Sequence, residues 1–329
     1  MTMTLAMTAR RLSRGIAVAL MLGLASFASQ AQYPNRPIRL VVPYGPGSAT
    51  DTFLRLVAEP LGAALGQTVI VDNRPGAQSA LATDLVAKAP ADGYTLLAAT
   101  NSLVANPAGM LHSVSYDPIR DFVPITRLGG TSYVLVVAAD QPWKTLNELL
   151  AHARANPGKL NYASGNLGGQ LYGGMLMKAA GVDMVHVPFK STPPGLLELL
   201  GGRVQLMFTD LATAAGQAKA GKVRPLLATA TQRSALFPDV PTIAESGVKG
   251  FADMPAWWAL YGPAGMPKDV IERLNREVSA ILQRPELRAK LAAQGIDTIP
   301  STPPGLADFT REQSQAYVRL IKEFNIQPE

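Results

Sequence analysis

The sequence predicts an α/β fold of two lobes, each built on a mostly parallel sheet, with a ligand cleft between them. Short apolar runs alternate with amphipathic stretches of helical length, a pattern typical of strand–loop–helix units with parallel strand pairing. This alternation restarts near residue 131, which indicates a second lobe. At 329 residues, 47% hydrophobic and 16% charged, the chain is long enough for two domains with apolar cores.

Up to residue 130 the pattern predicts three strands and two helices. They are, in order, a strand at residues 38–42, a helix from about Asp51 to a stop at Gly66, a strand at 68–71, a helix at 79–88 and a strand at 94–98. Pro60 lies inside the first helix and is expected to kink or end it.

The second lobe and the C-terminal region continue the pattern. Strands are expected within residues 132–140 and at 160–163, 185–187, 204–208 and 225–230, with a helix around 146–153. After the strand-like "WWALYGPAG" come helices at residues 268–283, 285–294 and 303–324. An end with one strand does not make a third domain, so we expect it to complete the first lobe. The predicted domains are therefore residues 32–130 plus 250–329 and residues 131–249, joined by crossings near Gly129-Gly130 and residues 247–250. The glycines at these crossings can absorb the dihedral change of a hinge; the alternative is that they are ordinary loop residues.

Residues 1–31 have the features of a bacterial secretory signal peptide. Three arginines precede an apolar run at residues 16–28, and Ser29-Gln30-Ala31 puts small residues at a cleavage site. The alternative, an uncleaved membrane anchor, needs about 20 apolar residues, and this run is shorter. We expect cleavage after Ala31 and a periplasmic location. Loss of three arginines and no acidic residue would lower the formal net charge from +6 to +3.

Composition and motif spacing argue against several classes of function. The sequence lacks a basic stripe with interleaved aromatic residues, which argues against a nucleic-acid partner. It also has no cysteine, which argues against a small secreted module held together by disulfides. His112, His152 and His186 are far apart, and none has a second ligand at helical spacing, so no metal is expected. Gly45-Pro46-Gly47 follows a strand, but Thr50 stands where a dinucleotide fingerprint has its third glycine, so no cofactor is expected.

Three loops of small residues between strand and helix are the strongest functional signal. They are "YGPGSATD", "NRPGAQSALATD" and "ASGNLGGQ". Each is expected to direct backbone N–H groups and a helix N-terminus toward one place, which favours anion binding. Hydroxyls and amides in these loops, with few cations nearby, suit a small organic carboxylate. Ser164 could also serve as a nucleophile, although serine at a helix start is more often an N-cap.

Nine motifs together resemble a known family. They are "YPNRPIRLVVPYGPGSATD", "GQTVIVDNRPGA", "VAKAPADGYTLLAAT", "YDPIRDFVPIT", "ANPGKLNYASG", "VHVPFKS", "LLGGRVQLMF", "FPDVPTIAESG" and "WWALYGPAGMP". In this order, over essentially the whole mature chain, they resemble the Bug receptors, the extracytoplasmic substrate-binding proteins of tripartite tricarboxylate transporters. The resemblance implies a two-lobed periplasmic-binding-protein fold (type 2-like) whose cleft captures a carboxylate for a two-component membrane permease.

The chain departs from the family pattern within the loops themselves. Members often read P-G-G in the first loop and G-A-G-G in the second, where this chain has Ser48 in place of a glycine and then Gln78-Ser79. In the third loop Tyr172 stands at a position where histidine is usual, and Thr209 stands where an aspartate is common. Backbone groups can still hold the first carboxylate of a ligand, so these departures leave open the identity of the group at its other end.

We therefore expect a monomeric, non-catalytic receptor for an aromatic carboxylate such as terephthalate or for an aliphatic dicarboxylate. The alternative is a secreted small-molecule hydrolase on the same scaffold. Trp257 and Trp258 are expected either to line the cleft or to pack in the core. The residues expected to bind the ligand are Tyr44, Gly45, Pro46, Gly47, Ser48, Ala49, Asp51, Ala77, Gln78, Ser79, Asn101, Ser164, Gly168, Gly169, Gln170, Phe189, Thr209 and Asp210.

Overall fold

A computed structural model describes residues 33–251, 254–324 and 326. The expected signal peptide and its cleavage site after Ala31 lie outside the described residues. Residues from Arg36 onward form one compact unit, and its strands form two separate sheets. The two-lobed α/β architecture is thereby confirmed.

The first sheet (sheet A) has six strands in the order β11-β4-β10-β3-β1-β2. Their bounds are β1 (Ile38–Val42), β2 (Val69–Asn73), β3 (Thr95–Thr100), β4 (Phe122–Thr131), β10 (Ala256–Pro263) and β11 (Asp297–Thr298). β1 contributes a continuous apolar run in which four of five residues are buried, as expected of a strand covered on both faces. Sheet A thus combines strands from both ends of the described chain, as the sequence predicted.

The second sheet (sheet B) has five strands in the order β7-β6-β8-β5-β9. Their bounds are β5 (Tyr133–Ala138), β6 (Asn161–Ser164), β7 (Val185–Pro188), β8 (Leu206–Asp210) and β9 (Val223–Ala228). All of β5 and β8 is buried, so this pair forms the centre of the sheet. The division of the chain into two domains stays a prediction.

The strand pairings are mixed, which corrects the expectation of mostly parallel sheets. Among the described strands, four pairings are parallel and five are antiparallel. The parallel ones join the strand–loop–helix units, β1 with β2 and β3, and β6 with β7 and β8. The antiparallel ones all involve β4, β5 or β10. Of these, β4 was not recognised as a strand because it contains Pro124 and two glycines, which are unusual within strands.

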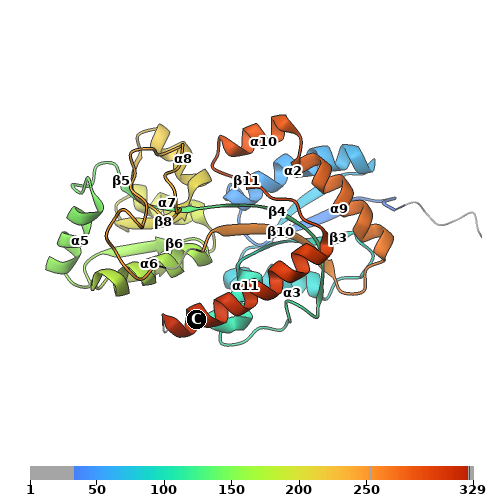
Figure 1. Cartoon of the computed structure of the whole chain (residues 1–329), viewed down its shortest axis with the longest axis horizontal. Helices are drawn as coiled ribbons and strands as arrows, with labels where there is room; N and C mark the ends of the chain where they lie inside the picture. Colours follow the sequence, from blue (N-terminus) through green and yellow to red (C-terminus); the bar gives the residue numbers. More distant parts are fainter. Residues whose placement is uncertain (1–32, 252–253, 325, 327–329) are drawn as a thin grey trace, which may run out of the picture. The chain divides into compact units, whose positions relative to one another are not determined.

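Helices cover both faces of each sheet (Figure 1). Around sheet A, α2 and α9 lie on one face and α3 and α11 on the other; around sheet B, α7 and α8 face away from α6. The helices are α2 (Ala49–Leu65), α3 (Ala80–Ala87), α4 (Ser102–Ala105), α5 (Leu146–Ala155), α6 (Leu167–Ala180), α7 (Thr192–Leu200), α8 (Leu211–Lys219), α9 (Lys268–Leu282), α10 (Pro285–Ala292) and α11 (Pro303–Glu323), with short turns η1 (Ala77–Ser79) and η2 (Asn106–Met110).

Helix α2 shows how local sequence sets these elements. Ser48 caps its start by accepting the N–H of Asp51 at 3.2 Å, and Gly66 ends it in the left-handed region at φ 70°. The helix begins two residues earlier than expected and continues through Pro60. Because the buried residues Ala58 and Leu61 lie on both sides of Pro60, tertiary packing outweighs the proline here.

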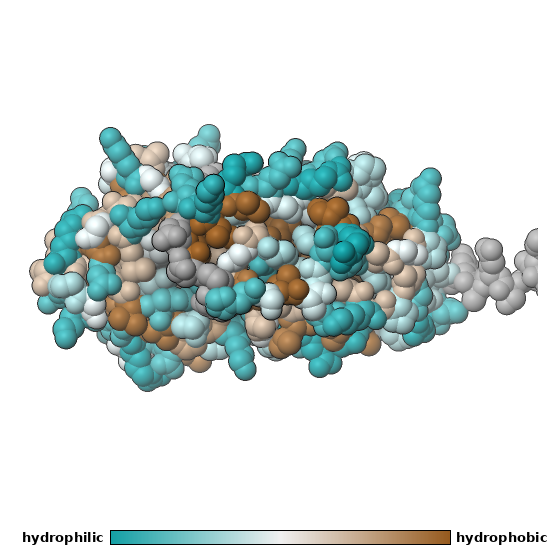
Figure 2. Space-filling model, turned by 90° about the horizontal axis from the view of Figure 1, so that it is seen from below, coloured by the Kyte–Doolittle hydropathy of each residue, from teal (hydrophilic) through white to brown (hydrophobic). Residues whose placement is uncertain are grey.

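The surface mixes hydrophilic side chains with separate hydrophobic patches on the face shown in Figure 2. Large apolar side chains that are exposed lie far apart in the sequence, at Ile70, Leu81, Ile119, Val185, Leu197, Ile299 and Val318. No helix within the described ranges has the length and apolar character needed to cross a membrane.

Candidate ligand-binding site

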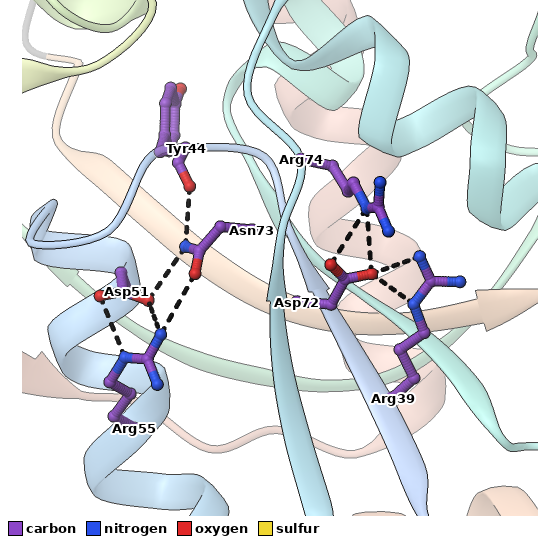
Figure 3. A network of polar contacts seen from close by, with 7 residues as sticks. All are labelled: Arg39, Tyr44, Asp51, Arg55, Asp72, Asn73 and Arg74. Carbon is purple, nitrogen blue, oxygen red and sulfur yellow. Dashed lines mark hydrogen bonds and ion pairs between the residues drawn. The ribbon is translucent and has the colours of Figure 1, made fainter.

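The first loop, between β1 and α2, is held in place by a buried carboxylate. Asp51 is 3% exposed and accepts the N–H of Gly47 at 2.9 Å, while its other oxygen accepts Asn73 Nδ2 at 2.9 Å. The same amide nitrogen donates to the Tyr44 carbonyl, and Arg55 pairs with the carboxylate from one turn further along α2 (Figure 3). Asp51 therefore positions the loop and does not line a cavity.

Hydrogen bonds determine the charge state of this carboxylate. Burial alone would raise the pKa of Asp51, but hydrogen bonds from Arg55, the Gly47 N–H and Asn73 outweigh it and lower the pKa. The carboxylate thus stays ionised inside the fold. Since Gly47 already donates to it, that N–H is not available to a ligand.

The second loop, between β2 and α3, has an unusual backbone. Ala77, Gln78 and Ser79 have φ values of 44°, 45° and 79°, in the left-handed region that favours glycine. Asn106 Nδ2 donates to the Gln78 carbonyl at 2.9 Å and holds this conformation. Ser79 is 3% exposed, and its hydroxyl has no hydrogen-bond partner among the described residues. Such strain is typical of ligand clamps.

The third loop, between β6 and α6, needs glycine for close packing. A Cβ on Gly165 would meet the backbone of Ser191 and Thr192, and one on Gly168 would meet the Tyr133 ring. The helix cap is Asn166, whose side chain accepts the N–H of Gly169 at 2.9 Å. The expectation of Ser164 as an N-cap is therefore wrong.

Ser164 instead pairs with a histidine. Its hydroxyl lies 2.7 Å from Nε2 of His186, which stacks on Tyr162 at 4.7 Å between ring centroids. The parallel pairing of β6 with β7 sets Tyr162 opposite His186 and so brings Ser164 within hydrogen-bond distance of His186, 22 positions along the chain. His186 thereby orients the Ser164 hydroxyl.

The second and third loops meet in a pocket of about 420 Å³, here called the cleft pocket. This volume lies within the usual range for small-molecule sites. Its lining comes from the carboxyl ends of strands in both sheets, where open α/β sheets bind ligands. The lining residues are Tyr44, Gly76, Ala77, Gln78, Ser79, Leu111, Ser164, Gly165, Asn166, Leu167, Gln170, Pro188, Phe189 and Lys190.

Contacts across the cleft join the two sheets' loops. Gln78 Nε2 donates to Gln170 Oε1 at 3.1 Å, from the second loop to α6. Deeper in, the Tyr172 hydroxyl accepts the backbone N–H of Met254 at 2.9 Å, and the ring packs against Tyr133 and Phe208. Tyr172 is thus a buried packing residue and not part of the cleft pocket.

A second, smaller cavity lies beside the cleft pocket and shares Tyr44, Asn166 and Leu167 with it. This polar chamber has a volume of about 30 Å³, enough for roughly one water molecule. Its other lining residues are Ser48, Ala49, Thr50, Thr100, Asn101, Tyr133, Thr192, Asp210, Ala256, Trp257 and Trp258. The first loop therefore contributes mainly to this chamber.

Asp210 is the one acidic side chain that lines the chamber. It is 4% exposed and caps α8 by accepting the N–H of Thr213 at 2.8 Å. Burial raises its pKa above the ordinary value, although hydrogen bonds from Thr213 oppose the shift. Burial thus disfavours the charged form of this carboxyl group relative to an exposed aspartate.

The two tryptophans belong to the core and to the chamber wall. Trp257 and Trp258 are 1% and 3% exposed, and neither lines the cleft pocket. Trp258 Nε1 donates to Thr50 Oγ1 at 2.7 Å and its ring packs on Phe53 at 5.2 Å between centroids. It therefore supports the first loop from behind.

The predicted site residues divide into three groups. Those in the cleft pocket are Tyr44, Ala77, Gln78, Ser79, Ser164, Gln170 and Phe189. Those in the chamber are Ser48, Ala49, Asn101 and Asp210, besides Tyr44. Those that line neither are Gly45, Pro46, Gly47, Asp51, Gly168, Gly169 and Thr209. Among the described residues, no group of three acidic or histidine side chains gathers that could hold a metal ion.

Sequence reasoning missed one cation at the cleft pocket, Lys190. It is exposed and follows β7, which pairs in parallel with β6. The carboxyl ends of parallel strands lie at the same edge of a sheet, and ligands bind there. Lys190 follows such a strand, so the same reasoning that predicted the loops could have found it. Leu111, Pro188 and Asn166 also line the cleft pocket and were not predicted, although Asn166 belongs to the third loop and Pro188 precedes the predicted Phe189.

Two lobes whose loops enclose a pocket of small-molecule size define a solute-binding protein of the periplasmic-binding-protein fold. The family model "Tripartite tricarboxylate transporter family receptor" matches residues 53–326. The chain belongs to this family. It is 34% identical to Protein BugT of Bordetella pertussis over 92% of this chain and 93% of that protein.

Two solved structures of similar proteins hold dicarboxylates. One is R. palustris Rpa4515 with adipate, at 31% identity and a TM-score of 0.86, covering 90% of this chain and 100% of that one. The other is MatC from Rhodopseudomonas palustris with bound malate, at 30% identity and a TM-score of 0.82, covering 88% and 100%.

Proposed function

We propose that this protein is a periplasmic receptor that captures a small organic dicarboxylate in the cleft pocket and delivers it to a two-component membrane permease. The observation that carries the proposal is the meeting of loops from both sheets in one pocket of about 420 Å³. Family membership and the adipate and malate complexes of similar proteins support the ligand class. Export, with cleavage after Ala31, and a monomeric state are parts of the same proposal.

The cleft pocket offers hydrogen-bond donors suited to a carboxylate. The buried Ser79 hydroxyl has no partner among the described residues, and His186 holds the Ser164 hydroxyl in place. Lys190 adds one positive charge among the lining residues. Each hydrogen bond to a charged acceptor contributes roughly 1.5–3 kcal/mol. Two or three such bonds suffice to offset the desolvation of a carboxylate.

The walls favour a flat or apolar ligand body. Tyr44, Leu111, Pro188 and Phe189 line the cleft pocket between the polar loops. We therefore place an aromatic dicarboxylate such as terephthalate first and an aliphatic diacid such as adipate second. Gln78 and Ser79 replace two glycines of the usual family loop, and their side chains make this pocket more polar beside the distal group.

The test is calorimetric titration of terephthalate and adipate, each beside its neutral diamide. We expect the acid to bind and the diamide to bind at least about ten-fold more weakly, because the donors face an anion. Ser79→Ala should weaken acid binding about ten-fold or more, whereas Ser314→Ala, on α11, should leave it unchanged. Equal affinity for acid and diamide would refute the carboxylate proposal.

Closure is tested by small-angle scattering. The Gln78–Gln170 hydrogen bond at 3.1 Å joins the two sides of the cleft pocket, so ligand binding should favour a compact form. Equal scattering from the free and the saturated protein would contradict closure around the ligand.

A second candidate function, hydrolysis, has one observation in its favour. The Ser164 hydroxyl lies 2.7 Å from His186 Nε2 and at the cleft pocket, which is nucleophile–base geometry. The receptor proposal requires that a bound acid or ester be recovered unchanged after denaturation. Turnover of p-nitrophenyl acetate that disappears in Ser164→Ala would instead establish the hydrolase.

A further inference from the structure

A further cavity lies on the α11 side of sheet A. It has a volume of about 260 Å³ and is called here the α11 pocket. Its lining residues are Arg127, Met254, Pro255, Trp257, Phe309, Gln313, Ala316, Tyr317, Arg319, Leu320 and Glu323. None of these side chains lines the cleft pocket.

Arg127, on β4, has no counter-ion among the described residues. Its guanidinium stacks over the Phe309 ring at 4.2 Å, and no described side chain or carbonyl accepts a hydrogen bond from it. It is half-buried, and this burial lowers its pKa because the charged form loses hydration. A half-buried charge of this kind is normally paired.

The other half-buried arginines of the two sheets show the contrast. Arg39, on β1, pairs with Asp72, and Arg224, on β9, donates to three backbone carbonyls at 2.7–3.0 Å. Both of these half-buried guanidinium groups therefore have hydrogen-bond or ion-pair acceptors. Arg127 is the exception, and it lies at a cavity.

A second unpartnered donor belongs to Trp257, which lines both the α11 pocket and the chamber. Trp257 is 1% exposed, and its indole Nε1 has no acceptor among the described residues. The Trp257 ring meets Phe309 edge-on at 5.4 Å between centroids. Two donors without acceptors and two aromatic walls thus belong to one cavity, which suits an acceptor group attached to a flat apolar body.

The formal charge of the side chains that line the α11 pocket suits a ligand with one negative charge. Its lining contains two arginines, Arg127 and Arg319, and one acid, Glu323, a formal sum of +1. A dicarboxylate would place its second group near a wall that already includes Glu323. The pocket therefore favours a monocarboxylate over the dicarboxylate proposed for the cleft pocket.

We propose that the α11 pocket is an accessory site for a small aromatic or apolar monocarboxylate, with Arg127 as its counter-ion. The carboxylate lies against the Arg127 guanidinium, and its ring or alkyl part packs between Phe309 and Leu320. This site is separate from the cleft pocket and does not depend on the function proposed for it.

The test uses benzoate as the probe in calorimetric titrations of the wild-type protein and Arg127→Met. We expect the variant to lose one benzoate site, or to bind benzoate there at least ten-fold more weakly. Methionine keeps the contact with Phe309 and removes an uncompensated charge, so the ligand-free variant should melt at a higher temperature than the wild type. Benzamide should not bind to this site.

Arg36→Met is the matched control. Arg36 also stacks on a ring, Tyr94 at 4.1 Å, but it is paired with Asp92 at 2.8 Å. We expect this variant to keep wild-type benzoate binding and not to gain thermal stability. Arg127→Lys keeps the charge without the planar fork and should bind benzoate with intermediate affinity.

One result would overturn the proposal. It is an equal number of sites and equal affinity for benzoate in Arg127→Met and wild type, with no rise in melting temperature. Arg127→Met changes no residue that lines the cleft pocket. If the cleft pocket proved not to bind a dicarboxylate, the benzoate titration and the melting temperatures would therefore still test the α11 pocket.

Discussion

The first and second loops follow neighbouring parallel strands of sheet A, yet they are stabilised in different ways. The first has one residue in the left-handed region, Gly47 at φ 77°, and is held by the buried Asp51 with Asn73 and Arg55 (Figure 3). The second has three consecutive non-glycine residues, 77–79, in that region, and the side chains of Asn106 and Thr83 donate to its Gln78 and Ser79 carbonyls. The first loop relies on hydrogen bonds and the second retains strain, and the strained loop lines the cleft pocket.

This difference indicates a division of labour between the two loops. The hydrogen bonds of the first loop keep its shape without a ligand. The strained backbone of the second loop holds its hydrogen-bond donors in positions that an unstrained chain would not adopt. Two of the three strained residues of the second loop, Gln78 and Ser79, replace the usual glycines, and both line the cleft pocket.

The largest expected effect comes from removing the brace of the first loop. Asp51→Ala leaves the Gly47 N–H and the Asn73 amide without their acceptor, and we expect a loss of about 2–4 kcal/mol in the free energy of unfolding. Urea denaturation measures it. Glu272→Ala, which breaks the exposed Lys268–Glu272 pair, is the control and should change stability by less than about 1 kcal/mol. Equal effects of the two variants would contradict the bracing role.

The pH dependence of the same carboxylate provides a second test. The folded-state pKa of Asp51 is lowered from 3.8, so its ionised form contributes stability above pH 3.8 that is lost as pH falls through the folded-state pKa. The stability difference between wild type and Asp51→Asn should therefore shrink as pH falls below about 4. A difference that stays constant from pH 7 to pH 3 would show that charge is irrelevant at this position.

The backbone of the first loop should tolerate a side chain less well than its open space suggests. At Gly47 a Cβ would have only Pro193 Cγ nearby, at 3.8 Å, so Gly47→Ala tests the φ of 77° alone. We expect a loss of about 1–2 kcal/mol. Gly174→Ala, inside α6 with nothing within 4 Å, is the control and should stabilise by up to about 1 kcal/mol. A neutral Gly47→Ala would remove the basis for calling this loop glycine-dependent.

The smallest change in the free energy of unfolding should come from relieving strain in the second loop, and it should be a gain in stability. Ser79→Gly relieves one strained residue and removes a buried hydroxyl without a partner, while glycine adds freedom to the unfolded chain. We expect a net gain of about 0.5–1 kcal/mol in the free energy of unfolding, together with weaker carboxylate binding. A variant that was both less stable and a better binder would reverse the comparison of the two loops.

Much of the fold could be read from the sequence because apolar runs and caps act locally. The strand at residues 38–42 and the helix stop at Gly66 are where they were expected. What could not be read depends on contacts between distant residues. The mixed pairing arises from β4, β5 and β10, and β4 is a strand despite Pro124 because it lies between β10 and β11.

The candidate site shows the same limit. The loops were predicted from their composition, but the roles of individual residues were not. Nothing local indicates that Asp51 faces its own loop, that Gly168 makes room for Tyr133, or that Ser164 meets His186. Each of these depends on register and packing that only the folded chain establishes.

The pairing of β4 with β10 has a mechanical consequence. β4 runs from Phe122 to Thr131, pairs with β10 along its length, and is separated from β5 of sheet B by Ser132 alone. A Cβ on Gly129 or Gly130 would collide with the carbonyl oxygen of Asp297 or Ala256, so these glycines permit close strand approach. One residue between two paired strands leaves this connection little length in which to change direction. The return crossing, from the end of β9 at Ala228 to the start of β10 at Ala256, is much longer.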